Sequence, residues 1–258
     1  MTFALELFAA ALVASIFGSM VGLGGGFILI PILRLFFGLE PAEAAGTSLV
    51  LVVANSASGA FTYFLQQRVH VRVGLLLAAG GFPGSILGAV LAKHITETAF
   101  DWIFAVFLIT VATDMVVNRK ARVGGRVDHE DMHARKPMSF RFAVAAGFFV
   151  GVVSSLFGVG GGVIVVPTLL YFSELPAHAI SATSHFAIFL TSPVGLAIHG
   201  MQDDIRIGDI FPLIAGGLLG GPIGARMSLR LQSPNLLIFV AVALLIAAGS
   251  LILRHILR

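Results

Sequence analysis

The chain has 258 residues, of which 57% are hydrophobic and only 11% are charged, and its formal net charge is +3 at pH 7. Soluble domains carry roughly a quarter charged residues, so this composition excludes an ordinary soluble domain and indicates a membrane protein. The absence of cysteine excludes disulfides, thiolate metal sites and cysteine nucleophiles. We expect an all-α polytopic protein embedded in the lipid bilayer, with no cofactor, no metal site and no nucleic-acid partner.

Apolar segments long enough to cross a bilayer core of about 30 Å recur along the whole chain. The eight predicted spans are Phe3–Phe37, Ala44–Leu65, Val73–Ala92, Phe100–Val117, Phe142–Phe172, Ala179–Met201, Ile210–Ala225 and Leu236–Leu253. The first lacks a basic leader and contains Glu6, so we expect a retained span rather than a signal peptide. It is also too long for one straight helix, because its 35 residues would extend about 52 Å.

The excess length of the first span coincides with three consecutive glycines followed by a proline. They lie in "VGLGGGFILIPIL" (Val21–Leu33), and "FGVGGGVIVVPTL" (Phe157–Leu169) repeats the pattern in the fifth span. Glycine triplets and prolines both weaken a helix. We therefore expect a broken or re-entrant helix at each Gly-Gly-Gly element. The alternative is that these glycines only let helices pack closely, since several of them are spaced four residues apart.

The two halves of the chain repeat each other at an offset of 136 residues. At this offset Gly24–Gly26 coincides with Gly160–Gly162, and Thr47–Ser48 coincides with Thr183–Ser184. Such agreement indicates an internal duplication of a four-span unit. The sequence therefore predicts an N-terminal transmembrane repeat at 1–117, a cytoplasmic linker loop at 118–141 and a C-terminal transmembrane repeat at 142–258.

Lys and Arg residues indicate orientation, because cytoplasmic loops are enriched in them. With eight simple spans, both termini and the linker lie on one side, which then carries 12 of the 16 Lys and Arg residues. We therefore predict that the termini and the linker are cytoplasmic and that the two repeats have the same orientation. If the first and fifth segments fold back as re-entrant hairpins, the parity changes and the repeats are inverted.

A helix that restarts inside the membrane presents free backbone N–H groups and the positive end of its dipole, which suit an anion. Secondary transporters use such broken helices at their substrate sites. Polar side chains of the second and sixth spans would complete the shell, although interhelical hydrogen bonding is an alternative role for them. The predicted substrate-binding residues are Gly24, Gly25, Gly26, Thr47, Ser48, Asn55, Gly160, Gly161, Gly162, Thr183, Ser184, His185 and Thr191.

Ionisable residues inside the spans are few, and each is a candidate for function. Asp114 and His185 are the candidates for ion coupling, and His185 is suited to a proton because histidine titrates near neutrality. A satisfied hydrogen bond or an interfacial position is the alternative for both. Arg34 is expected to extend to the outer surface, and Tyr63 and His199 are expected near an interface.

These elements resemble the sulfite exporter TauE/SafE family. The resemblance rests on Phe17–Pro31 and, in shorter form, Ser155–Pro167, together with the Thr-Ser pairs that end "LEPAEAAGTS" and "ELPAHAISATS". Members of this family are inner-membrane permeases associated with sulfite, sulfonates and related small anions. The resemblance implies a multi-pass protein of the bacterial cytoplasmic (inner) membrane that works by secondary transport.

The sequence thus predicts a secondary transporter, in the export direction, for a small sulfur-containing anion such as sulfite or an organosulfonate. It would bind the anion at the broken-helix N-termini between the repeats, with coupling to a proton or another ion, as a single chain or as a homo-oligomer. The alternatives are a transporter of another small organic anion and an anion channel. An enzyme is disfavoured because the G-x-S-x-G nucleophile pattern is absent around the candidate serines. A subunit of an ATP-driven system would need a partner to bind the nucleotide.

Overall fold

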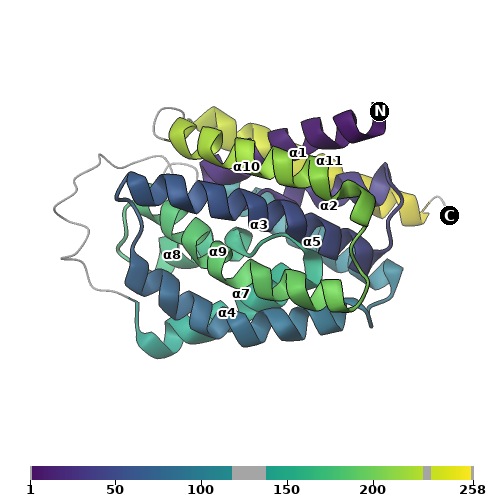
Figure 1. The fold of residues 1–258 in the computed structure, drawn as a ribbon. Coiled ribbons are helices and arrows are strands. Elements are labelled where there is room, and N and C mark those ends of the chain that lie inside the picture. Colours follow the sequence, from purple (N-terminus) through teal and green to yellow (C-terminus); the bar gives the residue numbers. More distant parts are fainter. Residues whose placement is uncertain (1, 118–137, 229–233, 257–258) are drawn as a thin grey trace.

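A computed structural model of the chain describes residues 2–117, 138–228 and 234–256 (Figure 1). The regular structure in these residues is entirely helical. In the labels of Figure 1, the elements are α1 (Thr2–Val21), α2 (Gly26–Leu35), α3 (Pro41–Leu65), α4 (Val71–Ala92), α5 (Glu97–Val117), α7 (Phe140–Phe157), α8 (Gly162–Phe172), α9 (Ala177–Met201), η2 (Ile207–Asp209), α10 (Ile210–Met227) and α11 (Pro234–Ile256).

Seven of these helical segments are long and apolar enough to cross a membrane, namely α1, α3, α4, α5, α7, α9 and η2 with α10. The C-terminal helix α11 adds the apolar stretch Leu244–Leu253. The predicted class of an all-α polytopic membrane protein is therefore confirmed. Together α1 and α2 cover the first predicted span, and α7 and α8 cover the fifth.

Each Gly-Gly-Gly element interrupts a helix, as predicted. Between α1 and α2, Gly22, Gly24 and Gly25 have φ angles of 86° to 87°. The corresponding break between α7 and α8 has φ angles of 69° to 84° at Gly158 and at Gly160–Gly161. Side chains are strained at such angles and glycine is not, so the glycines allow the chain to leave the helix and restart it.

Both short helices are re-entrant. The chain turns back after α1, so that a Cβ on Gly25 would lie 2.9 Å from the carbonyl oxygen of Ala14. Leu33, near the end of α2, packs in one apolar cluster with Leu7, near the start of α1. In the same way, the rings of Phe142 at the start of α7 and Phe172 at the end of α8 lie 4.6 Å apart. Each short helix thus returns to the end of the molecule at which the preceding helix began.

The start of α1 and the end of α11 lie at the opposite end of the molecule from the end of α5 and the start of α7 (Figure 1). We call the end where α1 begins and α11 ends the terminal face, and the end where α5 ends and α7 begins the linker face. At the terminal face Arg34 of α2 is bonded to Asp101 near the start of α5. At the linker face Tyr171 of α8 is bonded to Asp114 near the end of α5.

This arrangement bears on the predicted orientation, because in the described residues α1 begins and α5 ends at opposite faces, which fits the re-entrant alternative rather than eight simple spans. Because α2 and α8 fold back, the net path of each half from one face to the other is made by the helices that follow them. These are α3, α4 and α5 in the first half and α9, α10 and α11 in the second. The helices α1–α5 therefore start from the terminal face, and α7–α11 start from the linker face. The prediction of parallel orientation assumed that each long segment crosses the membrane once, which neither does.

The two groups of helices interlock rather than stand apart. Helix α1 packs on α10 and α4 packs on α7, while α3 contacts both α9 and α10. Glycines make the closest of these contacts possible. A Cβ on Gly84 of α4 would press into the backbone of α7 at Phe148, and one on Gly224 of α10 would press into α1 at Ile16.

Candidate functional site

The two glycine breaks lie against each other in the interior of the molecule. A Cβ on Gly26 would come within 2.9 Å of the Cα of Val159, and one on Gly162 within 2.7 Å of the Cα of Leu23. The side chains of Val52 and Ile188, from the middle of α3 and of α9, pack around both breaks. The structure therefore brings together Gly24–Gly26 and Gly160–Gly162, and it does so in a closed, tightly packed state.

The serines of the two Thr-Ser pairs hold the breaks in place. The Ser48 hydroxyl donates to the carbonyl oxygen of Gly158 at 2.9 Å, and the Ser184 hydroxyl donates to that of Gly22 at 2.7 Å. Both serines are buried. Each one satisfies a carbonyl that the helix break in the other half of the chain leaves without a helical partner.

The threonines of the same pairs face the loops instead. Thr47 Oγ1 accepts a hydrogen bond from the backbone N–H of Arg206, and Thr183 Oγ1 accepts one from that of His70, each at 3.0 Å. These bonds tie the start of α3 to the α9–α10 connection and the start of α9 to the α3–α4 connection. The threonine side chains are thus bonded to loop backbone rather than to the glycine elements.

A buried polar network surrounds the first break. The Asn55 amide donates to the carbonyl oxygen of Gly24 at 3.0 Å, and the Ser19 hydroxyl donates to Asn55 Oδ1 at 2.8 Å. Ser19 Oγ also lies 3.0 Å from His185 Nε2. His185 Nδ1 is buried and has no hydrogen-bond partner among the described residues. The structure therefore joins His185, Ser19 and Asn55 to Gly24, and Ser19 is the member that the sequence prediction missed.

The second break has no equivalent network. Thr191, which corresponds to Asn55 at the 136-residue offset, donates to the carbonyl oxygen of Ala187 in its own helix at 3.0 Å. Leu49 occupies the position that corresponds to His185. A pattern of repeated glycines and hydroxyls cannot reveal this asymmetry, but comparison of the two offset positions can.

Tyr63 and His199, which the sequence predicts near an interface, lie near the ends of α3 and α9, and both are completely buried in the protein. The Tyr63 hydroxyl donates to the carbonyl oxygen of Ser19 at 2.6 Å, and His199 Nε2 lies 2.9 Å from that of Ser155. These two bonds are again related by the 136-residue offset. Both side chains brace the last turn of the helix that precedes a break.

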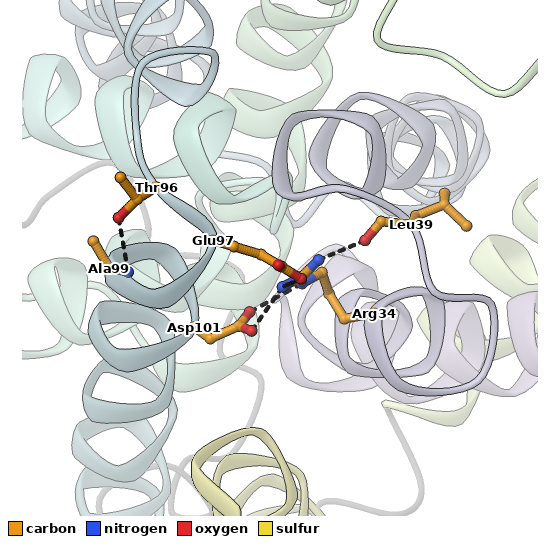
Figure 2. A network of polar contacts seen from close by, with 6 residues as sticks. All are labelled: Arg34, Leu39, Thr96, Glu97, Ala99 and Asp101. Atoms are coloured by element: carbon orange, nitrogen blue, oxygen red, sulfur yellow. Dashed lines mark hydrogen bonds and ion pairs between the residues drawn. The ribbon is translucent and has the colours of Figure 1, made fainter. Parts of the chain in front are cut away.

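Arg34 does not extend to the surface, contrary to expectation, because its side chain is held by two carboxylates (Figure 2). Asp101 and Glu97 of α5 bind the guanidinium, and the carbonyl oxygen of Leu39 accepts a further bond at 2.5 Å. Asp114, the other predicted coupling residue, is partly buried and accepts a hydrogen bond from the Tyr171 hydroxyl at 3.0 Å. These two groups fasten the ends of the re-entrant helices to α5.

Membrane-length helices with two re-entrant segments whose breaks meet inside the protein define a polytopic membrane transport protein. Residues 7–251 match the family model described as "Sulfite exporter TauE/SafE". Because that match covers nearly the whole sequence, the chain belongs to this family. No solved structure matches the chain.

Named relatives support the same class. The chain is 29% identical over 258 residues to the "Probable membrane transporter protein YunE" of Bacillus subtilis (strain 168), which covers 93% of this chain and 94% of the relative. It is 30% identical over 225 residues to a "Probable membrane transporter protein" of Haemophilus influenzae, covering 86% and 83%. It is 27% identical over 247 residues to the "Probable membrane transporter protein YfcA" of Escherichia coli (strain K12), covering 92% and 86%.

The family and these relatives are membrane transporters and not enzymes. The linker does contain one H-E-x-x-H pattern, His129–His133, which binds zinc in metalloproteases when it lies on a helix. This pattern lies outside the described residues. Within the residues that are described, no group of three or more His, Asp or Glu side chains has the arrangement of a metal site.

Proposed function

We propose that this protein is a secondary transporter that exports a small sulfur-containing anion, such as sulfite or an organosulfonate. The observation that carries the proposal is the meeting of two re-entrant helix N-termini beside the buried Asn55–Ser19–His185 network. The family description supports sulfur anions as the substrate class. The same geometry would serve another small organic anion, so the substrate is decided by the experiment below.

The anion binds between the N-termini of α2 and α8. The first N–H groups of a helix have no acceptor within it, and each N-terminus carries roughly half a positive charge. In this state some of them donate to the breaks themselves, as Gly162 N–H does to the carbonyl oxygen of Gly160 at 2.8 Å, and such bonds must open for the anion. Gly25 and Gly161 end the two breaks and precede these N–H groups. Two converging N-termini offset about one negative charge, which suits a monovalent anion.

Binding requires the breaks to separate, because in the described state they are in van der Waals contact. The bonds from Ser48 to Gly158 and from Ser184 to Gly22 link each break to the other half of the chain. When one half rocks against the other, these two hydroxyls lose their carbonyl partners and become free to bind the anion. The Ser48 and Ser184 hydroxyls, with Asn55 and Thr191, are thus the proposed polar shell. Thr47 and Thr183 join it when their bonds to the loop backbone also open.

We also propose that the two halves, 1–117 and 142–258, are duplicated units joined by the 118–141 linker. Support comes from hydrogen bonds that recur at the 136-residue offset, such as those of Ser48 and Ser184. The opposite starting faces of α1 and α7 then correspond to inverted repeats, which secondary transporters use for alternating access.

The linker face is proposed to be cytoplasmic, in a bacterial inner membrane. By chain position the terminal face receives only Arg34, Lys93, Arg206, Arg254 and Arg258 of the 16 Lys and Arg residues. In sequence, the others fall in or next to the segments between helix ends that lie at the linker face, and such enrichment marks the cytoplasmic side. The termini are then on the outer side of the membrane.

The test is uptake and release of radiolabelled sulfite by purified protein in liposomes. We expect saturable flux and counterflow against a trans-side pool of unlabelled sulfite, because a carrier exchanges substrate across an occluded state. Asn55→Leu should reduce the flux strongly, whereas Ser139→Ala, an exposed change at the linker face, should not. Flux without saturation or counterflow would indicate an anion channel, and absence of flux for sulfite and for methanesulfonate would contradict the substrate class.

A further inference from the structure

Arg68, in the short connection between α3 and α4 at the linker face, is a buried cation whose hydrogen-bond partners among the described residues are all neutral. Its side chain donates to Gln66 Oε1 at 2.9 Å, to Ser228 Oγ at 3.0 Å and to the carbonyl oxygen of His178 at 3.0 Å. Its Nε is buried and has no hydrogen-bond partner within the described part of the chain. The residue as a whole is 1% exposed.

Burying a guanidinium without a counter-ion costs several kcal/mol, so such a group calls for an explanation. Arg34, the other fully buried arginine, is compensated by Asp101 and Glu97. The guanidinium of Arg68 lies instead over the Tyr63 ring, with its Cζ 5.1 Å from the ring centre. It also lies beside the C-terminal ends of α3 and α10, which carry partial negative charge. Burial lowers the pKa of the Arg68 guanidinium, and the electrostatic effect of Tyr63 acts against that shift. Helix dipoles and a ring offset part of the charge, and a full negative charge is still lacking.

The corresponding connection at the terminal face has the opposite charge. At the 136-residue offset, Arg68 corresponds to Asp204 and Gln67 corresponds to Asp203. The two connections share their backbone form, since Gln67 and Asp203 have φ angles of 55° and 60°. The difference between the two faces is therefore one of charge and not of shape.

A pocket at the terminal face is acidic. It has a volume of about 370 Å³, and its charged lining consists of the four carboxylates Glu40, Glu43, Asp203 and Asp204 and of Lys93. Like charges repel an anion from this pocket. The described connections at the linker face instead hold the buried Arg68 and His178, the partly buried His70 and the exposed Arg72, beside one acidic residue, Glu174. The charge difference favours entry of an anion at the linker face and its departure at the terminal face.

We propose that Arg68 is the site that receives the transported oxyanion at the linker face. This inference rests on the proposed transport function and adds an entry site and a direction to it. A guanidinium binds the two oxygens of a sulfonate or sulfite group with paired N–H donors. An arriving anion accepts hydrogen bonds from the Arg68 N–H groups that now donate to Ser228 and His178. Loss of these two bonds releases the end of α10 and the start of α9. The way inward passes Tyr63, whose hydroxyl is bonded to Ser19 in the polar network at the first break.

The first experiment measures anion binding without transport, by thermal unfolding of the detergent-purified protein at constant ionic strength. Methanesulfonate and sulfite replace chloride stepwise. We expect both anions to raise the unfolding midpoint of the wild-type protein and of Arg72→Met, an exposed arginine in the same region. Arg68→Met should lose the rise and Arg68→Lys should keep part of it. An anion-dependent rise that persists in Arg68→Met overturns the proposal.

A second measurement keeps Arg68 in place, in case Arg68→Met does not fold. Because the chain has no cysteine, Gln66→Cys provides a single thiol beside Arg68. Its reaction with a maleimide should slow as sulfate, which does not react with maleimides, replaces chloride. Glu40→Cys at the terminal face serves as the control and should react at the same rate throughout. Equal rates at Gln66→Cys with and without sulfate overturn the proposal.

Flux separates this inference from the proposed function. Arg68→Lys should raise the apparent KM for sulfite entering from the linker face about tenfold or more, with a smaller change at the terminal face. Wild-type flux with an unchanged KM in Arg68→Lys and Arg68→Met overturns the entry site and leaves the transporter intact. Binding that depends on Arg68 in a protein without flux retains the anion site and contradicts the transport function.

Discussion

Arg34 and Asp101 form a two-point ion pair that fastens a re-entrant helix to a membrane-spanning helix. Arg34 Nε lies 2.9 Å from one carboxylate oxygen of Asp101, and a terminal guanidinium nitrogen lies 2.6 Å from the other (Figure 2). Both residues are 1% exposed, whereas the side chain of Glu97, the second carboxylate, is 35% exposed. The pair holds the end of α2 against the start of α5 at the terminal face.

Breaking this pair should be costly because it leaves an uncompensated buried charge. We expect Asp101→Asn to lower the free energy of unfolding by about 3–5 kcal/mol, measured by denaturant unfolding in detergent. Glu97→Gln is the matched control and should cost about 1 kcal/mol or less, since its partner interaction is open to water. The double variant Arg34→Met with Asp101→Leu should be more stable than either single variant. A double variant as unstable as the sum of the singles would contradict a direct pairing.

The two serine hydrogen bonds that link the halves of the chain should also stabilise the fold. Ser48→Ala and Ser184→Ala each leave a carbonyl oxygen of a glycine break unpaired, at an expected cost of about 1–3 kcal/mol. Ser56→Ala is the control, because the Ser56 hydroxyl bonds only within its own helix, to Val53. Thermal unfolding of the three variants in one detergent decides the matter. A cost at Ser56 equal to that at the other two positions would refute a special role for the crossing bonds.

The glycine breaks could be predicted from sequence because their signal is local: three adjacent glycines in a segment too long for one span. The partners of the hydroxyls could not, since the bond from Ser48 reaches 110 residues along the chain to Gly158. Arg34 was misjudged for a similar reason. Its partner Asp101 is 67 residues away and lies in an otherwise apolar span, where a single acidic residue does not reveal what it faces.

The orientation of the chain in the membrane depends on a different kind of information. The count of Lys and Arg is a parity argument, so its result depends on whether Gly26–Leu35 and Gly162–Phe172 continue across the membrane or fold back. Hydropathy is the same in both cases. The decision comes from contacts such as that between Leu7 and Leu33, which depend on the folded chain.

The opposite placement of the termini and the linker can be tested by labelling in whole bacteria. Glu40→Cys lies in the connection after α2 at the terminal face, and Ser139→Cys immediately precedes α7 at the linker face, both exposed. In the cysteine-free chain, a membrane-impermeant maleimide should label Glu40→Cys in intact cells. It should label Ser139→Cys only after the membrane is opened. Labelling of both positions in intact cells, or of neither, would contradict opposite faces.

Two effects of replacing a glycine with alanine can be separated: the loss of stability from steric contact of the new Cβ, and the loss from the positive φ angle. Gly25 and Gly38 both have positive φ, but a Cβ on Gly25 meets the Ala14 carbonyl oxygen at 2.9 Å and one on Gly38 meets nothing within 4 Å. Gly38→Ala should therefore cost about 1–2 kcal/mol from its φ angle alone. Gly25→Ala should cost about 1–3 kcal/mol more, because α1 and α2 must move apart. Equal unfolding midpoints for the two variants would rule out close packing as the reason for Gly25.

His185 is the group proposed to carry the coupled proton, because it is buried beside the first break and its Nδ1 has no hydrogen-bond partner in the described part of the chain. Proteoliposome flux should be measured between pH 5.5 and 8, which spans about one unit on either side of the ordinary histidine pKa. Methanesulfonate is the better substrate here, since its charge is constant over this range and that of sulfite is not. We expect wild-type flux to depend on pH and on an imposed pH gradient. His185→Gln, which retains a polar partner for Ser19, should lose both dependences.

The control for this measurement is His94→Gln, which changes an exposed histidine at the end of α4 and should keep the wild-type profile. His185→Leu copies Leu49, the residue at the corresponding position of the other half. It removes the titrating group together with the bond to Ser19, so comparison with His185→Gln separates the proton from the hydrogen bond. A variant that still transports against a pH gradient with an unchanged profile would move the coupling away from His185. In that case Asp114, held by Tyr171 at the linker-face end of α5, is the next group to change.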